Sequence, residues 1–160
     1  MAKVEQLPRG RHRLTREEVL ASQRGRMLNA MVEAVAEKGF ARVTVKDVLT
    51  GAGVSRETFY EHFANKDDCF FQAYDGASAI VQDAIAGGWQ EDIEQAATPL
   101  ERLDHAVGAY LEAMASEPLV SRVFMIDILA AGPEAVRRRY EMMQAFTALV
   151  ASLVDARSDA

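Results

Sequence analysis

The sequence is poor in the residues on which disulfides, metal sites and many catalytic centres depend. Its 160 residues include one cysteine, Cys69, and three histidines, His12, His62 and His105. A single cysteine excludes an internal disulfide and suits a reducing compartment. The chain also lacks an apolar run long enough to span a bilayer and a signal-peptide pattern at its start. These absences predict a cytoplasmic protein with no membrane partner.

The same shortage argues against the common enzyme classes. A nucleophilic triad needs a histidine beside its serine or cysteine, and a carboxylate-bridged metal site needs two Glu-x-x-His pairs on facing helices. The sequence has no such pair, no zinc-ligand spacing and no glycine-rich phosphate loop. We therefore expect a protein that is not an enzyme and that needs no metal or cofactor.

Positive charge is concentrated at the beginning of the chain. Residues 1–66 hold 12 Lys and Arg against 8 Asp and Glu, whereas residues 67–160 hold 6 against 16. The net negative charge of the whole chain argues against non-specific binding to polyanions. The basic residues 1–66 are nevertheless compatible with a local polyanion site. Residues 1–14 have no periodicity and contain three arginines, so we interpret them as a flexible basic arm or as a chain end without a role.

Start and stop signals divide the rest of the chain into helices. Helix starts are predicted at Thr15, Thr44, Ser55, Asn65 and Thr98. The first helix should end at Gly39, the second at Gly53 and the fourth at Gly87–Gly88, with Trp89 in a loop or irregular end. Residues 119–132 are apolar nearly all round and predict a buried helix, and a last helix should run from Pro133 to about Val154. No hairpin or repeat signal is found, so the predicted class is all-α.

The second and third predicted helices meet at a tight glycine turn, which is typical of a helix-turn-helix unit. Phe59 and Phe63 share one face and should be buried on the first helix. The opposite face is polar and is available to DNA bases, or it is simply a solvated face. The residues that we expect to bind DNA are Thr44, Ser55, Arg56, Glu57, Thr58, Tyr60, His62 and Lys66.

The stretch from Met27 to Phe71 resembles the DNA-binding domain of the tetracycline-repressor (TetR) family, through "AEKGF", "TVKDV" and "AGVSRETFYEHFANKDD". The resemblance covers roughly the first 70 residues. It implies that Thr44 contacts a phosphate, that residues 55–58 begin the recognition helix and that Tyr60 faces the groove. It also implies backbone contacts by His62 and Lys66. Glu57 stands where the family often has a small residue, and Leu49 where alanine is common.

The resemblance further implies a domain at 15–65 that binds DNA and a helical domain at 66–160 that binds a small molecule and forms a homodimer. Family members usually continue for two further long helices that pair subunits. We therefore expect that the chain is shortened or that it dimerises through the helices from Leu119 and Pro133. Aromatic residues and methionines supply material for an apolar pocket. The candidate ligand-binding residues are Tyr74, Trp89, His105, Tyr110, Met114, Phe124 and Met143, although each is also ordinary core material.

The sequence thus predicts a transcription regulator. It is expected to be a repressor that binds a palindromic double-stranded DNA operator as a homodimer and that a small apolar or aromatic effector releases. A helical enzyme or a protein-interaction module without DNA binding is the alternative.

Overall fold

Side-chain caps begin the helices at the predicted residues. The computed structural model describes residues 15–92 and 98–155. Thr15, Thr44 and Thr98 each form a capping box with the acidic residue three positions later. Ser55 accepts a hydrogen bond from the amide of Thr58 at 3.0 Å, and Asn65 accepts one from the amide of Asp68 at 2.9 Å. Each cap satisfies a backbone donor that the first turn of a helix leaves without a partner.

The described residues form helices and 3₁₀ turns and contain no strand, which confirms the all-α class. The elements in chain order are α1 (Arg16–Lys38), η1 (Phe40–Arg42), α2 (Val45–Ala52), α3 (Arg56–His62), α4 (Lys66–Asp92), α5 (Pro99–Ser116), α6 (Pro118–Met125), η2 (Asp127–Ala131) and α7 (Pro133–Asp155). Within the described ranges, no helix is long and apolar enough to cross a membrane. The predicted basic arm at 1–14 lies outside the described residues.

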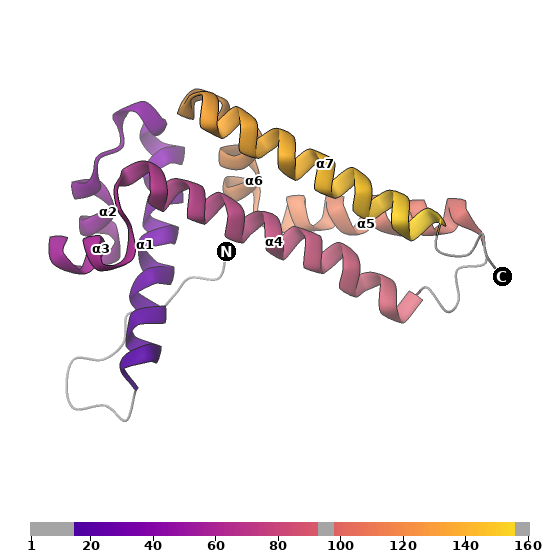
Figure 1. Ribbon diagram of the computed structural model, residues 1–160, viewed down its shortest axis with the longest axis horizontal. Helices are drawn as coiled ribbons and strands as arrows, with labels where there is room; N and C mark the ends of the chain where they lie inside the picture. Colours follow the sequence, from indigo (N-terminus) through magenta and orange to yellow (C-terminus); the bar gives the residue numbers. More distant parts are fainter. Residues whose placement is uncertain (1–14, 93–97, 156–160) are drawn as a thin grey trace.

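Helix α4 joins the two ends of the molecule. Figure 1 shows α1, α2 and α3 gathered around the start of α4, while α5 and α7 run beside the rest of it. Helix α6 lies between these two groups and packs on α1. A movement of α4 or α6 would therefore be transmitted to the first three helices.

One hydrophobic core links the first three helices to the later ones. Phe59 and Phe63 are buried against α1 and α2, as the sequence predicts. The ring of Phe70 at the start of α4 lies 4.8 Å from that of Phe40 and 5.9 Å from that of Phe124 on α6. The core thus continues across the predicted boundary at residue 65, because the first turns of α4 belong to both groups of helices.

Two predicted elements differ from the structure. Helix α4 continues past Gly87–Gly88 to Asp92, because the cost of glycine in a helix, about 1 kcal/mol each, is small for so long a helix. Residues 119–132 form not one buried helix but α6 and η2, which meet at Ile126. Leu119, Ile126 and Leu129 are exposed, so the apolar run is buried on one side only.

Candidate nucleic-acid interface and internal cavity

Helix α3 is a short helix with one buried face and one polar face. Its apolar residue Phe59 is fully buried, and Phe63, which caps its end, is 2% exposed. Arg56, Glu57 and Tyr60 lie on the exposed side. The guanidinium of Arg56 stacks 5.5 Å from the Tyr60 ring centre and donates a hydrogen bond to its hydroxyl at 3.3 Å. The two side chains therefore form one patch of cationic and aromatic character on the exposed side of α3.

The turn that leads into α3 depends on two glycines. Gly53 ends α2 in the left-handed conformation, with φ 63° and ψ 43°, and the amides of Gly53 and Val54 both bond to the Leu49 carbonyl. A Cβ atom on Gly51 would lie 2.9 Å from the Cβ of Ala30, so α2 approaches α1 more closely than a side chain there would permit. These positions set the direction in which α3 presents its polar face.

Thr44 lies at the exposed start of α2, where its hydroxyl pairs with Asp47. Asp47 also accepts a hydrogen bond from Lys38 at 2.6 Å, which ties α2 to the end of α1. The Lys38 ammonium and the Thr44 groups lower the pKa of the Asp47 carboxyl to about 2. Thr44 thus combines a cap with an exposed hydroxyl at a helix start, a position that suits a phosphate contact.

Lys66 and His62 are turned toward the protein. The Lys66 ammonium donates to the Phe40 carbonyl at 3.1 Å and lies 4.3 Å from the Phe40 ring centre. His62 is half-buried, and its Nε2 has no hydrogen-bond partner among the described residues. Thr58 is half-buried too, and its hydroxyl lies 2.9 Å from that of Ser55. The exposed DNA candidates are therefore Thr44, Ser55, Arg56, Glu57 and Tyr60.

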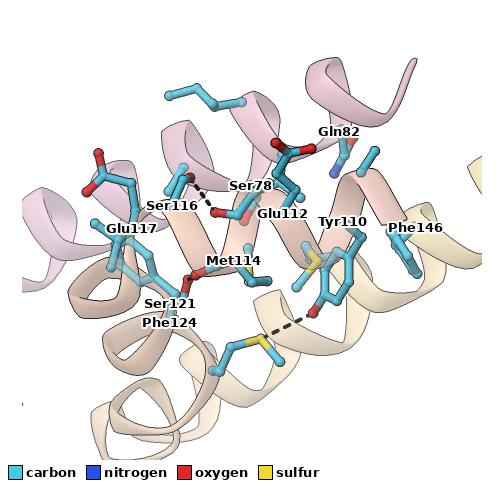
Figure 2. Close-up of a pocket in the computed structure, with 18 of the residues that line it drawn as sticks. Ser78, Gln82, Tyr110, Glu112, Met114, Ser116, Glu117, Ser121, Phe124 and Phe146 are labelled. Carbon is cyan, nitrogen blue, oxygen red and sulfur yellow. Dashed lines mark hydrogen bonds between the residues drawn. The ribbon is translucent and has the colours of Figure 1, made fainter. Parts of the chain in front are cut away.

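A separate cavity of about 570 Å³ opens between α4, α5, α6 and α7 (Figure 2). Its wall is largely apolar, and the rings of Tyr110 and Phe146 lie 5.0 Å apart on it. It is lined by Tyr74, Ala77, Ser78, Ile80, Val81, Gln82, Ala109, Tyr110, Glu112, Ala113, Met114, Ser116, Glu117, Val120, Ser121, Phe124, Met125, Met142 and Phe146. A cavity of this size suits a small molecule or part of a larger one.

Four of the candidate ligand residues line this cavity: Tyr74, Tyr110, Met114 and Phe124. His105 and Met143, also predicted to bind the ligand, do not line it. His105 is exposed on α5, and Met143 points outward because it follows the lining residue Met142 by about 100° around α7. The side chain of Trp89 lies outside the described residues.

The wall of the cavity also holds polar residues that are not among the candidates predicted from the sequence. Ser78 and Gln82 follow Tyr74 at spacings of four residues on α4, and Glu112 follows Tyr110 on α5. The spacing on α4 could have indicated a shared face. Polar side chains such as these differ from the aromatic residues and methionines that typically indicate an apolar pocket.

Helix α6 connects the cavity with the first helix. Val120, Ser121, Phe124 and Met125 of α6 line the cavity. Between them in sequence, Arg122 donates a hydrogen bond to the carbonyl oxygen of Ala36 at 2.6 Å, near the end of α1. A second bond, to Asp127 at 3.2 Å, holds the same guanidinium. The wall of the cavity and the helix-turn-helix unit thus share one short helix.

Comparison with known proteins agrees with this arrangement. Residues 27–73 match the family described as "Bacterial regulatory proteins, tetR family". The HTH-type transcriptional repressor KstR2 of Mycobacterium tuberculosis H37Rv is 31% identical over 93 residues, which are 58% of this chain and 44% of the repressor. The chain thus matches less than half of that relative's length.

Solved structures share the fold over more of the chain. A transcriptional regulator from Aquifex aeolicus superposes with a TM-score of 0.70 at 18% identity. The superposition covers 85% of this chain and 73% of the Aquifex chain. FadR from Bacillus subtilis, solved in complex with stearoyl-CoA, superposes with a TM-score of 0.67 at 22% identity. The superposition covers 78% of this chain and 65% of the FadR chain. The segment that runs from α1 into the start of α4 therefore matches the tetR family of bacterial regulatory proteins, and the described chain shares the fold of the solved regulators.

Proposed function

We propose that this protein is a transcription regulator whose α3 helix reads DNA in the major groove. The observation that carries the proposal is the polar face of α3, on which Arg56 and Tyr60 form a patch beside Glu57. Burial of Phe59 and Phe63 leaves this face no role in the core. A helix of this kind places its first residues against base edges, while flanking groups such as Thr44 contact phosphates.

The protein acts as a homodimer on a palindromic operator under this proposal. Helix α3 spans seven residues, about two turns, and so reads only a few base pairs. Two copies related by a two-fold axis double the length of the site that is read, with half-sites about one turn of DNA or a multiple of it apart. Support comes from the helix-turn-helix unit and not from any contact between copies.

The cavity serves as the effector site, and its occupation weakens DNA binding. Its apolar wall suits an alkyl chain or an aromatic ring. The similar FadR structure contains stearoyl-CoA, whose chain is of that kind. Because coupling between two sites is reciprocal, DNA should lower the affinity for the effector by the same factor. This behaviour corresponds to a repressor.

The test begins with selection of bound sites from random duplex DNA by the full chain. We expect an enriched inverted repeat whose affinity falls steeply as salt rises. The double variant Arg56→Ala/Tyr60→Ala should abolish the enrichment. The control Arg137→Ala removes an exposed positive charge on α7, far from α3 in sequence. This variant should still enrich the inverted repeat. If no sequence is enriched, or if both variants bind alike, the DNA-reading role is wrong and a protein-interaction module is the better description.

A further inference from the structure

We infer that the cavity binds an amphipathic molecule with a cationic or neutral head and disfavours one with an anionic head. This inference rests on the proposed effector role of the cavity and names the chemical class of the effector. It follows from the charges on the wall, from which wall groups are already hydrogen-bonded, and from the aromatic residues beside them.

Among the described residues, the wall of the cavity has carboxylates and no cationic side chain. Among its lining residues are Glu112 and Glu117, and none is Lys, Arg or His. A ligand carboxylate or phosphate would therefore meet charge of its own sign and no charged donor. Desolvating an anion without such a partner is unfavourable, whereas an ammonium group would find a carboxylate.

The three arginines of α7 do not line the cavity. Arg139 donates to the Phe124 carbonyl at 3.4 Å and contacts the Met125 sulfur at 3.8 Å without lining the cavity. Arg137 and Arg138 line a neighbouring polar cleft between α4 and α7. There they pair with the acidic residues Glu134, Glu141 and Asp75. A ligand anion would have to break these pairs to gain Arg137 or Arg138 as a partner.

Glu112 and Gln82 are among the polar side chains of the wall that remain available to a ligand. The hydroxyls of Tyr110, Ser116 and Ser121 already donate within the protein, to the Met125 sulfur and to the carbonyls of Ala113 and Met114. By contrast, Glu112 and Gln82 make no hydrogen bond or ion pair with any described residue. Figure 2 shows both of them on the wall that also holds Tyr110 and Phe146.

These groups together suit a cationic amphiphile. The Tyr110 and Phe146 rings can contact an alkyl chain or the methylene groups next to a cation, to which ring faces are attractive. Glu112, exposed at the rim, can pair with an ammonium group while the chain lies along the apolar wall. The acidic balance of residues 67–160 strengthens the preference.

The experiment compares three probes with one chain length: decylammonium, decanol and decanoate. Each is titrated below its micelle concentration into the full chain at neutral pH, with binding measured by calorimetry. We expect decylammonium to bind more tightly than decanol, and decanoate most weakly, with a difference of roughly 5-fold or more between the two ions. If decanoate binds as tightly as decylammonium while decanol also binds, the inference is overturned and the effector site stands. If none of the three binds, the effector role fails, and the inference fails with it.

Two variants locate the preference. Glu112→Gln keeps the shape of the side chain and removes its charge, so it should lower the affinity for decylammonium by roughly 2- to 5-fold and leave decanol unchanged. The control Asp104→Asn removes an exposed carboxylate from the same helix, α5, outside the cavity, and should change neither affinity. Equal losses in the two variants would show that the overall negative charge, and not the cavity, selects the cation, which overturns the inference.

Discussion

The guanidinium of Arg122 donates a hydrogen bond to the carbonyl oxygen of Ala36 across 86 residues of sequence, at 2.6 Å. The Ala36 carbonyl is one of the last four of α1, which have no partner within the helix. A cation at this end of a helix is also favoured by the helix dipole. Since the neighbours of Arg122 on α6 line the cavity, this bond links a helix of the cavity wall to the end of α1.

We therefore predict that Arg122→Gln weakens the coupling between effector and DNA. The measured quantity is the ratio of DNA affinities with and without a saturating effector, for which typical couplings are about 5- to 150-fold. The ratio should move toward 1 in the variant. Arg137→Gln, whose ion pairs lie within α7, is the control and should keep the ratio. An unchanged ratio in Arg122→Gln would refute a role of this hydrogen bond in the coupling.

Gly51→Ala should destabilise the protein. The added Cβ would lie 2.9 Å from the Cβ of Ala30, so α2 must move away from α1. We expect a loss of about 1–3 kcal/mol in the free energy of unfolding, measured with urea. Gly76→Ala on α4 is the matched control, because nothing lies within 4 Å of the added atom there. That change should stabilise the helix slightly, by about 0.5–1 kcal/mol. Similar effects of the two substitutions would contradict the close approach.

The contribution of Asp47 to stability should disappear in acid. Its pKa is about 2 in the folded protein, below the ordinary 3.8, because Lys38 and Thr44 bond to the carboxylate. A lowered pKa means that the contribution is complete above about pH 4 and is lost as the pH falls toward 2. The difference in Tm between the parent and Asp47→Asn should therefore shrink over this range. Glu134 also has a pKa near 2, but it titrates in both proteins and does not affect their difference. A difference that is independent of pH would refute the assignment.

Lys66→Ala separates two roles of one ammonium group. The group has three N–H donors and uses one on the Phe40 carbonyl, so others remain for a phosphate. Loss of this bond and of the ring contact should lower the free energy of unfolding by about 1–2 kcal/mol. Loss of a phosphate contact should weaken binding to all sequences and reduce the slope of log affinity against log salt by roughly 1. If stability falls while the slope stays the same, Lys66 only holds the turn at Phe40.

Glu57 is expected to contribute to base choice. It is exposed in the first turn of α3, where a carboxylate favours the helix dipole but is repelled by phosphates. A glutamate can accept a hydrogen bond from the N4 amino group of cytosine, and the neighbouring Arg56 can pair with guanine. Glu57→Gly should therefore raise affinity for random DNA and relax the preference for G·C at one position of each half-site, by roughly 1–3 kcal/mol. A selected-site profile identical to that of the parent would leave Glu57 with only the helix-start role.

The sequence by itself determined where most helices begin and which face of α3 is buried. A cap is a bond between residues three positions apart, as in Thr44 and Asp47, and so it can be recognised from local sequence. The spacing of Phe59 and Phe63 likewise identifies the buried face of α3 without knowledge of its neighbours. Such local features are also what the resemblance to a family depends on.

Tertiary structure decided the matters that depend on distant partners. Sequence alone does not reveal that Lys66 turns inward to Phe40, or that Arg122 reaches Ala36. It also does not distinguish Met142, on the wall of the cavity, from Met143, which is exposed. The reason is physical: adjacent helical residues with the same chemistry differ only in the direction in which they point. That direction acquires a meaning only when α4, α5 and α6 pack beside α7.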